Sequence, residues 1–181
     1  MGITIGLDCS TRSSGWAVFD NDTLITYGVI KTEQEDWHER LYQQAKEIGE
    51  LFDLYKPETV YMEDVPLNLA GGAKIVVMLG AVQGMLYGVA ASRGISMKFI
   101  QPSAWRSPLG LYTGCRDGTK RAELKKKSIE KANELFGLDL IYKSPSSKFN
   151  CDDISDAILL CYSQIKKKHF AKSLDKCYIV M

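Results

Sequence analysis

The stretch Ile3-Thr4-Ile5-Gly6-Leu7-Asp8-Cys9 opens the chain with a short apolar run that is rich in β-branched residues and leads into an acid. Two more such runs follow closely, at Trp16–Phe19 and Leu24–Ile30, separated by the turn-forming groups Ser13-Ser14-Gly15 and Asp20-Asn21-Asp22. Short runs of this kind joined by tight turns predict three antiparallel strands.

The rest of the chain alternates between helical and strand patterns. Apolar residues recur at helical spacing or fill long stretches in four segments, and compact β-branched runs lie between them. We expect helices over Glu35–Tyr55, Ala73–Ser92, Lys120–Phe136 and Asp152–Lys168, and strands over Thr59–Met62 and Ile95–Gln101. The segment 102–119, which is rich in proline and glycine, is expected to be irregular. This order predicts an α/β fold: a mixed five-stranded sheet, with three antiparallel strands and then two parallel ones, flanked by helices.

Length and composition indicate one globular domain. The chain has 181 residues, of which 45% are hydrophobic and 25% charged, and this balance excludes a disordered protein. We place the domain at residues 1–168, followed by a basic C-terminal tail at 169–181. Five cysteines without a C-x-x-C pair, and only two histidines, argue against a disulfide framework or a zinc site. Free thiols and the lack of a signal-peptide pattern favour a cytoplasmic location.

The net charge of +1 conceals a strong segregation of charge along the chain. Residues 1–64 carry 5 basic and 13 acidic side chains, whereas residues 65–115 carry 4 basic and no acidic ones. Such a pattern is typical of a protein with separate acidic and basic surfaces.

The apolar segment Ile75–Ala91 contains no charged residue and approaches the length of a bilayer span. It is the one such segment in the chain and lies between two predicted strands, so we interpret it as a helix buried on both sides and expect no membrane contact. Gly80, Gly84 and Gly88 strip side chains from one face of this helix. That stripe fits either intramolecular packing or a homodimer interface.

Acidic residues follow two of the predicted strands and begin the last helix. Asp8 ends the first strand, Glu63 ends the fourth, and Asp153 and Asp156 share one face of the helix. If those strands are neighbours and the helix crosses their ends, the four carboxylates converge and repel one another. Mg²⁺ relieves such repulsion, with Mn²⁺ as a substitute, and two such ions about 4 Å apart are suited to phosphodiester hydrolysis.

Each acid also has a structural interpretation. Asp8 could cap a turn, Asp153 could complement the helix dipole, and Asp152 is interpreted as the N-cap of the last helix. Asp64 is expected to be a solvated neighbour of Glu63.

The acids lie in sequences that resemble the RuvC-type Holliday-junction resolvases of the RNase H-like superfamily. Gly6–Ala17 (GLDCSTRSSGWA) resembles the family's first motif, Glu63 in Tyr-Met-Glu-Asp-Val the second acid, and Asp153-Ile-Ser-Asp156-Ala-Ile the closing D-x-x-D-A motif. Gln101–Arg106, which leads through a glycine-rich link to Lys120, is similar to the basic region. The resemblance runs from about Ile3 to Lys168, and the short, lysine-rich chain looks like a phage or viral branch.

This resemblance implies an RNase H-like fold, a homodimer, Mg²⁺, and paired nicks with 5′-phosphates across a four-way DNA junction. Asp8, Glu63, Asp153 and Asp156 would be the catalytic metal ligands. The setting would be the cytoplasm of a bacterial or phage-infected cell, or a viral factory. The bacterial resolvases often place an aromatic wedge shortly after the second acid, but Val65–Leu69 contains none. Either Leu67 or Leu69 takes that role, or the junction preference is relaxed.

Basic residues between the second acid and the closing motif are the candidates for phosphate contacts. An acidic metal site needs nearby cations to hold a polyanion, so we expect DNA contacts here rather than a merely solvated helix face. The candidates are Arg106, Arg116, Lys120, Arg121 and Lys125, within a cluster that includes Lys126 and Lys127. Lys166–Lys168 is interpreted as a solvated face, and Trp105 and Tyr112 could either stack on bases or anchor the loop.

Three other function classes compete with a resolvase. The first strand and its turn also suit an actin-like sugar kinase or ATPase, but those enzymes need two lobes. A non-catalytic DNA-binding scaffold would have no reason to keep costly carboxylates together. The main alternative is a related RNase H-like nuclease that cuts forks, flaps or RNA.

Overall fold

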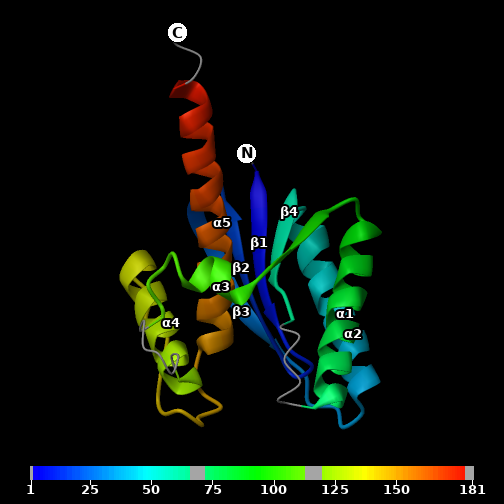
Figure 1. The fold of residues 1–181 in the computed structure, drawn as a ribbon. Coiled ribbons are helices and arrows are strands. Elements are labelled where there is room, and N and C mark those ends of the chain that lie inside the picture. The colour runs from blue at the N-terminus through cyan, green and yellow to red at the C-terminus, as the bar shows by residue number, and fades with distance from the viewer. Residues whose placement is uncertain (1, 66–71, 113–119, 178–181) are drawn as a thin grey trace.

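One five-stranded sheet, in the order β3-β2-β1-β4-β5, forms the centre of the molecule (Figure 1). The structure is a computed structural model that describes residues 2–65, 72–112 and 120–177, with side chains as far as residue 167. The strands are β1 (Ile3–Cys9), β2 (Ser13–Asp20), β3 (Thr23–Lys31), β4 (Thr59–Glu63) and β5 (Ser96–Ile100). β1, β2 and β3 are antiparallel, whereas β4 and β5 run parallel to β1, which confirms the predicted mixed sheet.

Helices cover both faces of this sheet (Figure 1). α1 (Trp37–Tyr55) and α2 (Ala73–Ala91) pack on one face, around a core that includes Ile48, Phe52 and Leu86. The other face carries α5 (Asp152–Cys177), with α3 (Pro102–Arg106) and α4 (Arg121–Phe136) beside it. Two apolar cores separated by a sheet make a three-layer α/β domain.

Two segments differ from the sequence-based expectation. The segment expected to be irregular begins with α3, because Pro102 fits the first turn of a helix. α5 continues to Cys177 rather than ending at Lys168, since nothing between these residues breaks a helix. The division into a domain at 1–168 and a tail at 169–181 stays a prediction.

α2 is not buried on both sides, so that prediction was wrong. It packs through Val82, Leu86 and Ala90, while Ile75 and Val77 are 50% and 66% exposed. Within the described residues it is the one helix long and apolar enough for a membrane crossing, with a mean hydropathy of 1.6 and 17% of that stretch buried. The physical reason is geometric: one sheet face can cover one side of a helix, and here the neighbours leave the outer side open.

α1 holds the turn that follows the first strand. It begins after Asp36, whose carboxylate accepts from the backbone N–H groups of His38 and Glu39. Its buried Gln44 donates to the carbonyl of Ser10 at 2.8 Å and accepts from the hydroxyl of Ser14 at 2.7 Å. The Gln44 side chain of α1 therefore holds the turn between β1 and β2 in place with two hydrogen bonds.

Two glycines let α5 lie directly on the sheet. A Cβ at Gly6 would lie 2.3 Å from the carbonyl oxygen of Ala157, and a Cβ at Gly15 would lie 1.9 Å from that of Asp153. Both contacts are with backbone, which cannot swing aside. The glycines thus set how close the first turns of α5 come to β1 and β2.

Candidate active site

Two neighbouring parallel strands bring the first two acids to one edge of the sheet. β1 and β4 pair in a register that sets Leu7 opposite Met62, so Asp8 and Glu63 follow side by side. β2 sets Gly15 opposite Asp8, and the start of α5 lies against that glycine. The sequence-based assumption that the two strands are neighbours and the last helix crosses their ends is confirmed.

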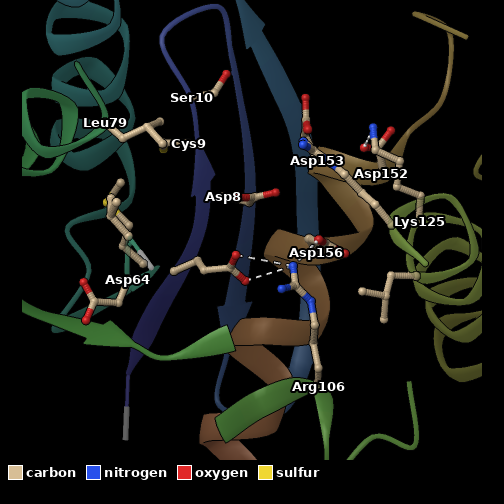
Figure 2. Close-up of a pocket in the computed structure, with 15 residues that line it drawn as sticks. Asp8, Cys9, Ser10, Asp64, Leu79, Arg106, Lys125, Asp152, Asp153 and Asp156 are labelled. Atoms are coloured by element: carbon tan, nitrogen blue, oxygen red, sulfur yellow. Dashed lines mark hydrogen bonds and ion pairs between the residues drawn. The ribbon is translucent and has the colours of Figure 1, made fainter. Parts of the chain in front are cut away.

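All four predicted acids line one pocket of about 400 Å³. Asp8, Asp153 and Asp156 point toward the same space from β1 and α5 (Figure 2). Glu63, Arg106, Arg121 and Lys125 also line it. Residues up to 148 positions apart along the chain therefore share one concave surface, as expected for a functional site.

Three of the acids are oriented by hydrogen-bond donors from other elements. The indole Nε1 of Trp105 donates to Glu63 Oε2 at 2.7 Å. The hydroxyl of Ser13 donates to Asp153, and the hydroxyl of Ser128 donates to Asp156. Donors of this kind fix the direction in which a carboxylate presents its remaining lone pairs.

Arg106 lies inside the carboxylate cluster rather than on an outer rim. Its Nη2 is 2.9 Å from Asp156 Oδ2 and 3.0 Å from Glu63 Oε2 (Figure 2). The expectation that this residue is simply available for phosphate contacts was therefore incomplete. In this conformation the guanidinium is engaged with two acids.

Burial raises the pKa of every acid in the set, and a neighbouring carboxylate raises each of them further. For Asp8 the pKa lies well above its usual value, first because of burial and then because Asp156, Glu63 and Asp153 are close. Burial also raises the pKa of Glu63 and Asp156, against the lowering effect of Arg106. The pKa of Asp153 is raised by burial and lowered in part by the hydrogen bond from Ser13. The cluster thus carries more negative charge than its surroundings compensate.

Asp8 is the acid with the clearest need for a cation. Its carboxylate forms no hydrogen bond or ion pair with any residue that the structure describes, although it faces the pocket. Oxygen donors without nitrogen or sulfur ligands suit a hard divalent cation. Over the described ranges, however, no three Asp, Glu, His or Cys side chains are arranged as a ready metal site. Arg106 lies between Glu63 and Asp156.

The two acids next to the set have partners of their own. Asp152 is the first residue of α5 itself rather than its N-cap, and its carboxylate forms an ion pair with Lys125. Asp64 is not merely solvated, because Gln83 and Gln101 both donate to its carboxylate. These side chains border the pocket without joining the central cluster.

The predicted DNA-binding residues fall into three groups. Arg121 and Lys125, on the first two turns of α4, line the pocket, and Lys120 is exposed just before that helix. Arg116 lies outside the described residues, as do Leu67 and Leu69. Lys126 and Lys127 pair with Glu130 and Glu123 within α4, which places them on its outer face.

Two contributors to the site, Ser128 and Ser13, escaped prediction from the sequence, which left the role of Trp105 open between stacking on bases and anchoring the loop. Ser128 carried a usable signal, since it is a polar residue on the otherwise apolar face of α4 with Leu124 and Ala132, and it is 2% exposed. Trp105 is fully buried, so it anchors the segment and does not stack on bases. Ser13 gave no local signal, because its partner Asp153 is 140 positions away.

Comparison with known proteins agrees with this geometry. A family model described as crossover junction endodeoxyribonuclease RuvC matches residues 4–120. Among curated relatives, the crossover junction endodeoxyribonuclease RuvC of Dictyoglomus thermophilum is 26% identical over 92% of this chain and 98% of its own length. That of Fusobacterium nucleatum is 28% identical over 89% of this chain and 78% of its own.

Solved structures share the fold over nearly the full length. Thermus thermophilus RuvC in complex with a Holliday junction substrate has a TM-score of 0.69 at 16% identity and covers 93% of this chain and 96% of its own. The yeast mitochondrial Holliday junction resolvase has a TM-score of 0.59 at 14% identity, over 94% of this chain and 83% of its own. Because the family model matches the region that holds the first strand, the second acid and Arg106, this chain belongs to the crossover junction endodeoxyribonuclease RuvC family.

Proposed function

We propose that this protein is a divalent-metal-dependent endonuclease that resolves Holliday junctions by paired phosphodiester hydrolysis. The observation that carries the proposal is the convergence of four acids from β1, β4 and α5 on one pocket, in a chain of the RuvC family. The T. thermophilus relative has been solved with a Holliday junction substrate, and that substrate is the one we propose here.

The residues of this chain divide the work between holding a cation and holding DNA. Asp8, Glu63, Asp153 and Asp156 would hold Mg²⁺, as two ions, with Mn²⁺ as a substitute. A bound divalent cation supplies a Lewis acid that activates water and neutralises charge on the leaving oxygen. Trp105, Ser13 and Ser128 keep three of the carboxylates aimed into the pocket.

Cations on one side of the pocket suit the phosphate backbone of a branched DNA. Arg121 and Lys125 line the pocket from α4, and Lys120 precedes them. Contacts of this kind hold and orient a polyanion without reading its sequence. Selectivity for junctions then depends on the shape of the DNA and on the relative positions of two active sites in a dimer.

A homodimer formed through α2 would supply the second site for paired nicks. A Cβ at Gly80, Gly84 or Gly88 would meet no atom of the described residues within 4 Å, so within that part of the chain the glycine stripe is left open. Exposed apolar side chains lie on the same helix. An exposed apolar helix with a row of glycines favours close contact with the same helix of a second copy. We place this dimer in the cytoplasm of a bacterial or phage-infected cell.

The test is a cleavage assay on four-way, three-way, forked, flapped and linear DNA and on RNA-containing duplexes, with and without Mg²⁺. We expect symmetrical nicks with 5′-phosphates on the four-way junction, and none with Asp8→Asn. Asp22→Asn, an equal change on an exposed turn far from the pocket, serves as the matched control and should cut normally. Preferential cutting of forks, flaps or RNA would mean that one of those nucleic acids, rather than the four-way junction, is the substrate. Full activity of Asp8→Asn would overturn the proposed site.

A further inference from the structure

A single nitrogen of Arg106 bridges two of the four acids. Its Nη2 lies within 3.0 Å of one oxygen of Glu63 and within 2.9 Å of one oxygen of Asp156. The side chains of Arg106, Glu63 and Asp156 are 16%, 17% and 14% exposed. A positive charge thus stands between two carboxylates at a largely enclosed position. The guanidinium donates a charge-assisted hydrogen bond to Asp156 at 2.9 Å and forms an ion pair with Glu63, to which it also donates a longer hydrogen bond at 3.4 Å.

This position is built by the fold rather than reached by a loose side chain. The guanidinium carbon lies 4.5 Å from the centroid of the Trp105 ring, and the same indole donates to Glu63. The backbone carbonyl of Arg106 accepts from the N–H of Leu111 at 3.1 Å, which ties down the end of α3. Stacking, the ion pairs and the helix end therefore all favour one placement.

We propose that Arg106 is an internal cation that competes with the divalent metal for Glu63 and Asp156, and that it leaves them for a DNA phosphate when substrate binds. This inference rests on the proposed function. The contacts with Arg106 occupy lone pairs of Glu63 and Asp156 that a metal ion would use, and a guanidinium beside that ion would add repulsion between like charges. A DNA phosphate offers the guanidinium a bidentate partner. Metal binding and DNA binding then strengthen each other, because each favours the state in which Arg106 has left the two acids.

The consequence for a variant is unusual. Removing a positive charge from a protein ordinarily strengthens cation binding only slightly, through long-range attraction. Removing this particular charge also frees two ligands. Arg106→Met should therefore bind Mn²⁺ at least about fivefold more tightly than the native chain in the absence of DNA, within the range of measured coupling between sites.

Arg93→Met is the matched control. Arg93 is also an ion-paired arginine, with its Nε 2.7 Å from Asp53 Oδ1, but Asp53 is outside the pocket. The two variants lose the same charge and the same guanidinium. The readout is Mn²⁺ affinity by isothermal titration calorimetry and by the loss of the free-ion paramagnetic resonance signal, neither of which needs turnover. Tighter binding by Arg106→Met with unchanged binding by Arg93→Met supports the inference, and equal or weaker binding by Arg106→Met overturns it.

Two further measurements cover a failure of Arg106→Met to fold. Arg106→Gln keeps a polar but shorter and uncharged side chain and should also bind Mn²⁺ more tightly. In the native chain, the Arg106 Nε–Hε resonance should shift in proportion to Mg²⁺ occupancy, and an unmoved resonance at full occupancy overturns the inference.

Asp8→Asn separates this inference from the proposed function. If native protein binds Mn²⁺ and Asp8→Asn does not, the carboxylate site stands, and the Arg106 variants alone decide the competition. If Asp8→Asn binds as well as native protein, the metal site is elsewhere and both proposals fail.

Discussion

Asp8 is the acid whose charge the fold compensates least. Its pKa in the folded chain is raised well above the ordinary value of 3.8. The folded protein therefore binds more protons here than the unfolded chain between these two pKa values. The contribution of Asp8 to stability is most favourable below the ordinary pKa and is lost as pH rises through the raised one. A metal ion must displace any proton that remains, so metal affinity rises with pH over the same window.

We therefore expect Asp8→Asn to abolish cleavage while stabilising the metal-free protein. With a chelator at about pH 8, its Tm should rise by about 2–4 °C, which corresponds to about 1 kcal/mol in a chain of this size. The gain should shrink as pH falls toward the ordinary range of an aspartate, because native Asp8 is then neutral as well. Thermal melts of both proteins at several pH values measure this, and a lower Tm for the variant at pH 8 would contradict it.

Ser128 contacts the carboxylate cluster through Asp156. Its hydroxyl hydrogen bond lowers the pKa of that acid against the effect of burial. Ser128→Ala should raise the pKa of Asp156 further, shift the rise of the pH–rate profile to higher pH, and weaken metal affinity by about 10–100-fold. Ser163→Ala is the control, since that buried hydroxyl donates to Leu160 in its own helix. A profile that falls in height without moving along the pH axis would mean that Ser128 is merely structural.

Among the elements, α5 determines the geometry of the site because it carries two of the acids. Gly15 sets its distance from the sheet, since a side chain there would meet the backbone of Asp153. We expect Gly15→Ala to reduce cleavage by at least about 100-fold, because displacing a reacting group by about 1 Å costs that much. In Gly49→Ala the new methyl group would meet only the end of the Arg93 side chain. That control should cut normally, and normal cutting by Gly15→Ala would show that α5 can shift without harm.

α2 is the element with an unpartnered apolar face. Val77 is 66% exposed, and a glutamate at this position would place a charge in the proposed dimer interface. Val77→Glu should move the protein from dimer to monomer in sedimentation velocity, with loss of paired nicking. Ile25→Glu adds the same charge at a 52% exposed position on β3 and should remain dimeric. A native chain that is monomeric at all concentrations would remove the dimer from the proposal.

At the scale of the whole molecule, acidic and basic residues that are far apart along the chain meet in one pocket. The four predicted acids line it together with Asp64 and Asp152, and Arg121 and Lys125 line it from α4. Junction binding should therefore weaken by at least about tenfold between 50 and 200 mM salt, through the loss of counterion release. Arg121→Gln should reduce the slope of log affinity against log salt by about 1, whereas Lys46→Gln, on the exposed side of α1, should leave it unchanged. A flat salt response of the native protein would exclude this surface as the DNA contact.

The sequence by itself determined the elements of this protein and the identity of its acids. Periodicity is a local property, so neighbouring residues were enough to predict several features. These are the strand over Ile3–Cys9, the helix before Pro57 and the acids that end β1 and β4. The order of strands and helices then predicted a mixed sheet, whereas the pairing of β1 with β4, which brings Asp8 and Glu63 together, was an assumption that the structure confirmed.

Only the tertiary structure decided which groups surround those acids. Arg106 reaches Glu63 across 43 positions and Asp156 across 50, and Ser13 reaches Asp153 across 140. No local pattern encodes such pairs, because they depend on how closely α5 and α3 pack on the sheet. The exposure of α2 has the same origin: composition gives the hydropathy of a helix, but its neighbours determine which side is covered.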